Sequence, residues 1–214
     1  MFKLNDTNKV LIEGEVVSKF TLNHEVFGEK FYTVELETAR LSGTKDIIPV
    51  MISDRLINIS ENYMGMVFKV SGQFRSYNKH EGDKNRLALS VFAKEVTVIL
   101  NNDEEDLSTN EICMDGYICK RPVYRETPLG RKIADLMIAV NRPYGKSDYI
   151  PCICWGRNAR FASGLEVGTR LKVQGRIQSR EYFKEISEGY SERRTAYEVS
   201  ISQMEVVESE ECKD

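Results

Sequence analysis

Residues 168–182 read GTRLKVQGRIQSREY, and this stretch decides the fold class. Leu171, Val173 and Ile177 alternate with polar residues, which predicts a strand that buries one of its two faces. Gly175 falls among the inward positions, where a strand glycine marks a sharp bend or a bulge at a barrel corner. The outward positions are Arg, Lys and Gln, so this strand is expected to present a cationic face.

Other segments with the same alternation surround this strand, at residues 111–122, 131–142, 148–156 and 195–207. Residues 157–168 read RNARFASGLEVG, which predicts a short helix that ends in glycine-rich turns. Three strands, a helix and two more strands is the order of an OB-fold, a closed five-stranded Greek-key barrel. Because many OB-folds bind oligonucleotides, this order makes nucleic acid a candidate ligand.

The chain carries this pattern twice. Shifted by 102 residues, Gly14 aligns with Gly116 and Pro49 with Pro151, and the offset grows to 103 and then 108 in loops, where insertions are tolerated. Further aligned pairs are Gly28 and Gly130, Arg40 and Arg142, Asp46 and Asp148, Gly72 and Gly175, and Ser76 and Ser179. We therefore predict an all-β protein of two tandem OB-fold barrels with a short helix per domain.

The predicted domains are repeat one over residues 1–98 and repeat two over residues 110–207. An acidic linker over 99–109 joins them, and a short acidic tail covers 208–214. The net charge of −3 argues at first against a nucleic-acid partner. Repeat two, however, has 16 basic and 12 acidic residues, whereas repeat one is neutral and the linker and tail are acidic. The overall acidity therefore comes from the connecting segments.

Composition excludes several classes of protein. With 41% hydrophobic and 29% charged residues the chain is expected to be soluble, and no apolar run approaches the roughly 18 residues of a membrane span. The N-terminal residues 1–17 lack the pattern of a signal peptide, so a cytoplasmic, nucleoid-associated location is expected. No phosphate-binding loop or catalytic pair occurs, so we predict a protein that is not an enzyme.

The cysteines lack the spacing of a metal site. They stand at Cys113, Cys119, Cys152, Cys154 and Cys212, far from the two histidines. In a cytoplasmic protein such cysteines behave as small apolar core residues. No metal or other cofactor is therefore predicted.

Repeat two resembles the bacterial single-stranded DNA-binding protein family along nearly its whole length. The resemblance lies in Gly116, Gly130, the A-x-N of Ala139 and Asn141, the Trp155-Gly156 pair before the helix, the run from Val173 to Tyr182, and the closing Glu198-Val199. This resemblance implies sequence-independent binding of single-stranded DNA, in replication, repair or recombination, by base stacking and phosphate neutralisation.

The resemblance also implies which residues contact DNA. The stacking residues would be Tyr144, Tyr149, Trp155 and Tyr182. Independently, strand alternation places Tyr149 and Trp155 on the face opposite the inward Ile150, Cys152 and Cys154, where the barrel does not need them. Phosphate contacts are expected from basic residues of the strand face and the loops, namely Arg125, Arg131, Lys132, Arg142, Lys146, Arg157, Arg170, Lys172, Arg176, Arg180, Arg193 and Arg194.

Repeat one keeps the apolar pattern but lacks the aromatic residues. The positions of Tyr144, Tyr149, Trp155 and Tyr182 are taken by Ser42, Ile47, Ser53 and Lys79. We therefore expect repeat two to do most of the DNA binding and repeat one to extend the site weakly or to serve assembly. By analogy with family members that bring four OB-folds together, a homodimer is expected.

Other interpretations stay open. The tail lacks the aromatic residue that ends the acidic tip of many family members, so recruitment of replication or repair proteins through it is doubtful. The chain could instead be an OB protein like primosomal replication protein N or of phage type, acting as a replication or recombination accessory and a protein-interaction scaffold. RNA is also possible, because stacking and phosphate contacts do not exclude a 2′-hydroxyl.

Overall fold

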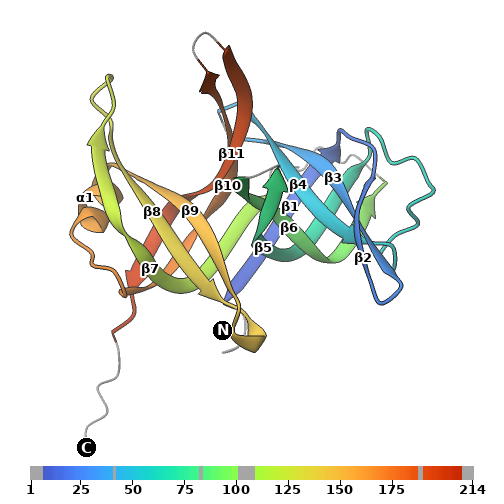
Figure 1. The fold of residues 1–214 in the computed structure, drawn as a ribbon, viewed down its shortest axis with the longest axis horizontal. Helices are drawn as coiled ribbons and strands as arrows, with labels where there is room; N and C mark the ends of the chain where they lie inside the picture. Colours follow the sequence, from blue (N-terminus) through green and yellow to red (C-terminus); the bar gives the residue numbers. More distant parts are fainter. Residues whose placement is uncertain (1–6, 41, 82–83, 101–108, 188–189, 209–214) are drawn as a thin grey trace, which may run out of the picture. The chain divides into compact units, whose positions relative to one another are not determined.

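The computed structural model describes residues 7–40, 42–81, 84–100, 109–187 and 190–208 (Figure 1). The strands of repeat one are β1 (Asn8–Val16), β2 (Thr21–Val26), β3 (Glu29–Ala39), β4 (Lys45–Ser53), β5 (Val67–Glu81) and β6 (Lys84–Ile99). Repeat two has β7 (Asn110–Glu126), β8 (Lys132–Asn141), the 3-10 turn η1 (Pro143–Gly145), β9 (Ser147–Trp155), the helix α1 (Gly156–Ser163), β10 (Arg170–Ser187) and β11 (Tyr190–Val206). Within these ranges no helix has the length and hydropathy needed to cross a membrane.

The contacts divide the chain into two compact units. Unit 1 comprises Met1–Lys9, Ile112–Arg176 and Val199–Asp214, and unit 2 comprises Val10–Glu111 and Ile177–Glu198. The units differ from the repeats chiefly in the outer half of the β10–β11 hairpin, Ile177–Glu198, which belongs to unit 2. The repeat boundaries stay a prediction. Apart from this segment and the first residues of β1 and β7, the strands of each repeat lie in one unit.

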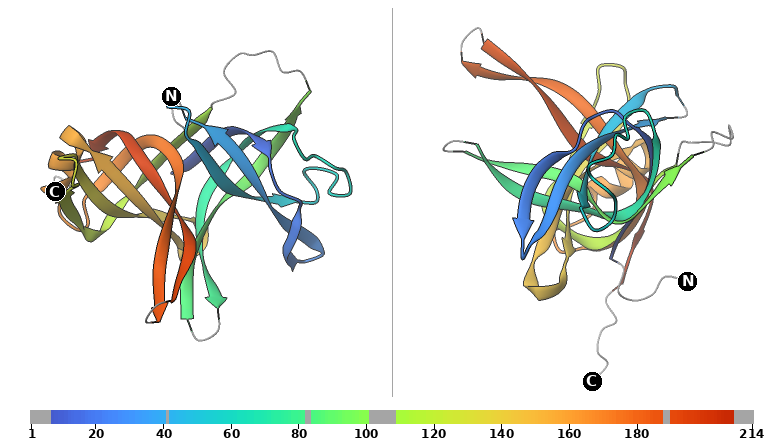
Figure 2. Two further views of the ribbon diagram at one scale, coloured as in Figure 1. Left: turned by 90° about the horizontal axis from the view of Figure 1, so that it is seen from above. Right: turned by 90° about the vertical axis from the view of Figure 1, so that its right-hand side faces the viewer.

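Each unit closes a five-stranded barrel, as the sequence predicts. In unit 1 the sheet order β10-β11-β9-β8-β7 is closed by antiparallel pairing of β10 with β7, and β9 pairs in parallel with β11. In unit 2 the order β1-β5-β6-β4-β3 is closed by pairing of β1 with β3, and β4 pairs in parallel with β6. The right-hand view of Figure 2 shows the strands of unit 2 curling around a common axis. The OB-fold prediction is therefore confirmed for both repeats.

The two barrels bury equivalent positions of their strands. Val50 and Ile52 on β4 are fully buried, and so are their repeat equivalents Cys152 and Cys154 on β9. Val91 on β6 and Val199 on β11 fill the other side of the same cores. The remaining fully or nearly fully buried apolar residues include Ile12, Leu36, Phe68, Phe74, Ile138, Ile150, Leu171 and Val173. Strand alternation therefore predicted the inward face of each barrel correctly.

The predicted helix is present in only one of the repeats. In repeat two α1 covers Gly156–Ser163, with Ala159 and Ala162 buried. In repeat one the corresponding residues 54–66 form turns. There the side chain of Asn58 accepts a hydrogen bond from the Ser60 amide, and that of Asn62 accepts one from the Met64 amide. Such local bonds compete with a helical backbone, which explains the difference.

The predicted glycines lie where two strand backbones almost touch. A Cβ on Gly175 would lie 2.2 Å from the backbone oxygen of Ser200 on β11. Its repeat equivalent Gly72 faces the backbone oxygen of Phe92 at 2.3 Å, next to a register shift between β5 and β6. A backbone atom cannot rotate away as a flexible side chain can. Glycine is therefore required at this corner of each barrel.

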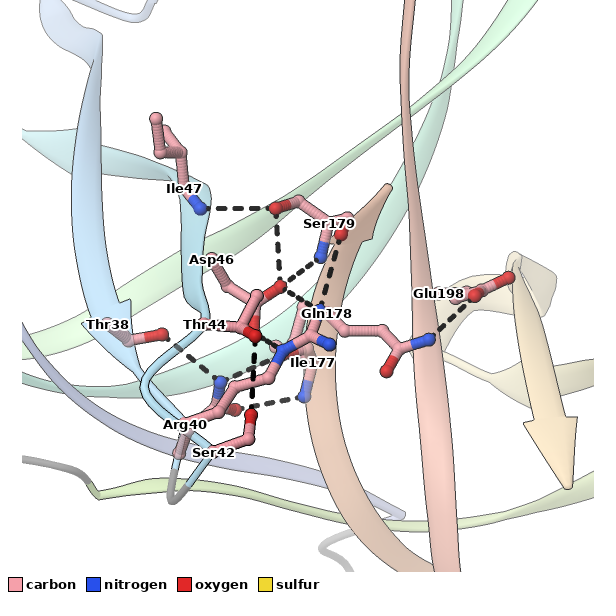
Figure 3. A network of polar contacts seen from close by, with 11 residues as sticks. Thr38, Arg40, Ser42, Thr44, Asp46, Ile47, Ile177, Gln178, Ser179 and Glu198 are labelled. Atoms are coloured by element: carbon pink, nitrogen blue, oxygen red, sulfur yellow. Dashed lines mark hydrogen bonds and ion pairs between the residues drawn. The ribbon is translucent and has the colours of Figure 1, made fainter. Parts of the chain in front are cut away.

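The hairpin segment Ile177–Glu198 is fixed to the barrel of unit 2 by a buried carboxylate (Figure 3). Asp46, fully buried, accepts two hydrogen bonds of 2.6 Å from the Arg40 guanidinium and one of 2.7 Å from the Ser179 amide. The Ser179 hydroxyl in turn accepts a bond from the Ile47 amide. The hydrogen bond to Asp46 raises the pKa of Arg40 above its ordinary value, so the guanidinium stays charged.

A second polar group fixes the same segment. The side-chain amide of Asn110 donates a hydrogen bond of 2.8 Å to the backbone carbonyl of Ile177. Its side-chain oxygen accepts one of 2.9 Å from the backbone N–H of Ile177. Gln178 is buried and donates to Glu198 at 2.7 Å. Sequence alternation had placed Gln178 on the outward, solvated face of its strand, and its burial corrects that expectation. At this point of β10 the hairpin segment is part of unit 2, and the outward Gln178 is buried there.

The substitution Gly175→Ala should lower the free energy of unfolding by about 1–3 kcal/mol, because the new methyl group collides with the β11 backbone. Urea denaturation of the full chain measures this. Gly164→Ala is the matched control: its Cβ would lie 3.6 Å from the nearest atom, and its φ of −90° is ordinary. Equal losses in the two variants would contradict the close approach.

The substitution Asp46→Asn should lower the free energy of unfolding by about 3 kcal/mol, because it leaves the Arg40 charge without its buried partner. The control is Glu37→Gln, which removes a more exposed ion pair with Lys45 and should cost about 1 kcal/mol or less. Denaturation of both variants at one pH gives the comparison. A loss for Asp46→Asn as small as the control's would show that the buried pair contributes little.

Candidate nucleic-acid interface

Strand β9 presents two aromatic rings on its outer face. Tyr149 and Trp155 are 49% and 40% exposed, whereas Ile150, Cys152 and Cys154 point into the barrel of unit 1. The two aromatic residues are six positions apart, so about 20 Å of strand separates them. Sequence alternation predicted this arrangement, and the structure agrees with it. Exposed rings at these points are not required by the core.

Cross-strand pairing extends the aromatic surface at one end of β9. Tyr149 lies opposite Ala139 on β8, and Ala139 lies opposite Tyr117 on β7. Directly opposed residues share one face of a sheet, so these three residues form a row with the small alanine between two tyrosines. Tyr117 is exposed and was not among the predicted site residues. The sequence signal that could have identified Tyr117 is its position directly after the inward Gly116, because alternation places the next residue on the outer face.

The other end of β9 carries a similar row. Trp155 lies opposite Ile133 on β8, and Ile133 lies opposite Arg125 on β7. Arg125 also forms a 2.7 Å ion pair with Asp135, in which both side chains are about half exposed. Between the two rows Lys120, exposed on β7, lies opposite Met137. Lys120 was also missed, because the register shifts of β7 on either side of it hide its orientation from simple alternation.

Tyr144 stands at the turn between β8 and β9. It is fully exposed, in the left-handed backbone region at φ 64°, and Gly145 follows at φ 68°. The residues that flank this turn, Arg142 and Asp148, form an ion pair of 3.1 Å in which the Asp148 side chain is only 1% exposed. The repeat equivalents Arg40 and Asp46 form the same pair in unit 2. Arg142 therefore has a structural role at this turn besides its predicted contact with phosphate.

The predicted cations fall into two groups. In unit 1, Arg170 is held by Asp115 through two 2.9 Å hydrogen bonds, and Lys172 is exposed two residues later. The remaining predicted cations of unit 1 are exposed or half-buried on its strands, loops and helix, at Arg131, Lys132, Lys146, Arg157 and Arg176. Unit 1 thus combines the exposed rings of β9 with basic groups on neighbouring elements.

The other predicted residues belong to unit 2, because they lie on the hairpin segment Ile177–Glu198. The Arg180 guanidinium lies 5.9 Å from the centre of the Tyr182 ring. Arg193 pairs with Glu181, and Arg194 pairs with Glu192 at 2.6 Å. The neighbouring Phe183 is 74% exposed and was missed, because strand alternation assigned only Tyr182 to the outward face. The predicted site residues are thus divided between the two units.

The inward cysteines are inert core residues. Cys152 and Cys154 are buried, and burial raises the pKa of Cys154 to about 12, with a smaller contribution from Asp135. A thiol with that pKa stays protonated at neutral pH and is neither a nucleophile nor a thiolate ligand. In the part of the chain that the structure describes, no group of three or more His, Cys, Asp or Glu could hold a metal ion. Cys212 lies outside that part.

Comparison with known proteins agrees with this geometry. Residues 109–207 match the model of the single-strand binding protein family. A single-stranded DNA-binding protein of Halalkalibacterium halodurans is 35% identical over 34% of this chain and 48% of its own length. Single-stranded DNA-binding protein A of Bacillus subtilis is also 35% identical, over 34% of this chain and 46% of its own length. The chain spans about half the length of the curated relatives that it matches.

A solved structure matches this chain over nearly its whole length. The wild-type single-stranded DNA binding protein from Thermus aquaticus superposes with a TM-score of 0.77, over 97% of this chain and 96% of that chain. A deletion mutant of the same protein gives a TM-score of 0.74. The sequence identity is 18% in both cases, so this likeness shows the fold. The resemblance seen in the sequence is confirmed.

A thiol reagent should label Cys152 and Cys154 only after unfolding. At a pKa of about 12 the Cys154 thiolate is about a thousandfold rarer than at an ordinary pKa near 9, and both side chains are out of solvent. Iodoacetamide treatment at pH 8, followed by peptide mass spectrometry, measures this. Cys113 and Cys119 are half-buried and serve as internal controls. Rapid native labelling of Cys154 would contradict its place in the core.

Proposed function

Since residues 109–207 belong to the single-strand binding protein family, we propose that this chain binds single-stranded DNA without regard to sequence. The observation that carries the proposal is the pair of exposed rings, Tyr149 and Trp155, on the outer face of a strand whose inner face closes the core. Every base has a π-face, so an aromatic platform stacks with any of them, at about 1–3 kcal/mol per base.

Positive charge supports the same proposal. Repeat two has a net charge of +4, and exposed cations such as Lys120 on β7 and Lys172 on β10 lie on the barrel that carries the rings. A nucleic-acid strand that stacks its bases on Tyr149 and Trp155 would bring its phosphates within reach of such groups. The cations that are ion-paired within the protein, such as Arg170, would contribute less than the others.

We place this activity in DNA replication, repair or recombination, as a binding function and not as an enzyme. The relatives are single-stranded DNA-binding proteins by name, which supports the binding function. Two tandem barrels per chain make a homodimer with four OB-folds the simplest closed assembly. Replication or repair proteins are proposed partners, and the cytoplasm, at the nucleoid, is the proposed location. Light scattering of the pure protein tests the assembly.

Adding poly-dT should quench the fluorescence of Trp155, which is the chain's single tryptophan, because a base stacks on its indole. Trp155→Ala and Tyr149→Ala should each weaken binding by about 1–3 kcal/mol, measured by fluorescence anisotropy of a labelled oligo-dT. Val167→Ala, in the exposed turn after α1, is the control and should leave affinity unchanged. Unchanged tryptophan emission at saturation would remove Trp155 from the site.

The affinity for oligo-dT should fall steeply with salt, because protein cations that contact phosphates release condensed counterions. Affinities measured at salt concentrations between about 50 and 200 mM give the slope of log affinity against log salt concentration. Lys172→Gln should lower that slope by about 0.7, the value for one phosphate contact on a single strand. A slope that is flat in the unmodified protein would count against phosphate neutralisation.

A further inference from the structure

Repeat one carries a row of contacting rings that its sequence alignment with repeat two does not reveal. The His24 imidazole stacks on the Phe31 ring, with centroids 4.8 Å apart and planes 11° apart. Phe31 contacts Phe92 at 5.6 Å, and the Arg75 guanidinium lies 4.0 Å from the centre of the Phe92 ring. These four side chains, here called the ring row, come from β2, β3, β6 and β5 of unit 2.

Strand register places the ring row on the outer face of the barrel. Phe31 lies on β3 at the parity opposite to the buried Val34 and Leu36. Strand β4 separates β3 from β6, so the two phenylalanine backbones are about 10 Å apart, yet their rings are 5.6 Å apart. The two side chains therefore lean toward each other over β4. This explains why Ser53 and Met51, on the same face of β4, are both only 6% exposed.

The ring row occupies the part of repeat one that corresponds to Trp155 in repeat two. Ser53 is the repeat equivalent of Trp155, and it lies directly opposite Phe31. The equivalents of Phe31 and Phe92 are Ile133 and Ser200, which are not aromatic. A small residue at Ser53 leaves room for the rings that lean over it from the neighbouring strands. In repeat two the aromatic side chains therefore come from the central strand β9, whereas in repeat one they come from β3 and β6, the neighbours of the central strand β4.

The outer end of the ring row faces solvent and is held in place. His24 is exposed, and its Nδ1 lies 2.8 Å from the side-chain oxygen of Asn23, whose amide donates to Thr33 on β3. The other end continues along β5, where Tyr77 is 37% exposed two residues beyond Arg75, at the same strand parity. The barrel core beneath is built from the inward residues of the strands, so His24, at the exposed end of the ring row, is not needed to complete it.

The charges near the ring row are compatible with a polyanion. Glu29, the acidic group beside Ser53, forms a 3.2 Å ion pair with Arg55 and accepts a hydrogen bond from Ser53. Its charge is therefore neutralised within the protein. Arg75 supplies a cation directly on a ring, an arrangement that suits stacking of a base together with contact to a phosphate.

We propose that the ring row is a second base-stacking site, in repeat one, for the same single-stranded DNA. This inference rests on the proposed function and extends it. It replaces the expectation that repeat one lost its aromatic platform and binds weakly. The rings are instead supplied by β2, β3 and β6, at positions that do not match those of repeat two.

A relocated tryptophan tests this site separately from the site in repeat two. In a chain with Trp155→Phe, the variant His24→Trp carries its single tryptophan at the outer end of the ring row. Poly-dT should quench its emission. The matched control is Leu22→Trp in the same background: Leu22 is 55% exposed on β2 but pairs with Tyr32, so it points to the opposite face of the β2–β3 ribbon. Its emission should not change.

The outcomes separate the two proposals. Quenching of His24→Trp without quenching of Leu22→Trp supports the ring row as a site. Quenching of Trp155 in the unmodified chain with an unchanged signal from His24→Trp overturns this inference and leaves the proposed function intact. Equal quenching of His24→Trp and Leu22→Trp also overturns it, because the effect would then not depend on the face. No quenching of Trp155 in the unmodified chain would count against the proposed function itself.

Affinity gives an independent measurement. His24→Ala and Phe92→Leu should each weaken binding of a long oligo-dT by about fivefold or more, the equivalent of one lost stacking contact. Leu22→Ala, on the opposite face, should leave it unchanged. Thermal melting of each variant verifies that the barrel is intact; a folded His24→Ala/Phe92→Leu double variant with full affinity would overturn the proposal.

Discussion

At one corner of each barrel two strand backbones meet with no room for a side chain. At Gly72 and Gly175 a Cβ would lie 2.3 and 2.2 Å from a backbone oxygen of the next strand. This contact bends the long strands β5 and β10 so that they can pair on both sides, with β1 and β6 in one unit and with β7 and β11 in the other. The other features of the molecule depend on the barrel that this bend permits, because a closed barrel commits one face of every strand to the core.

The outer face is then free to differ between the repeats. In repeat two the rings project from the central strand at Tyr149 and Trp155. In repeat one the central strand has Ile47 and Ser53, and the rings of the same face come from the neighbouring strands at Phe31 and Phe92. The inner face tolerates only apolar exchanges, such as Val50 for Cys152, because it must fill a closed volume.

The hairpin segment Ile177–Glu198 has a second function besides carrying candidate DNA contacts. Its Ser179 amide binds the buried carboxylate of Asp46, and its hydroxyl accepts from the backbone of Ile47. Ile47 is the repeat equivalent of Tyr149, so in repeat one this position belongs to the docking surface of the hairpin. That gives a structural reason, besides DNA binding, for the different residues at these two positions.

The sequence by itself determined the repeat, the strands, the inward faces and the exposure of Tyr149 and Trp155, because alternation and glycine positions are local properties of a strand. It did not determine the turns over residues 54–66, where asparagine side chains compete with a helix. Nor did it determine the burial of Gln178, or the contact between Phe31 and Phe92. Those depend on which segments pack together and on rings that lean across an intervening strand, and only the tertiary structure decides such long-range contacts.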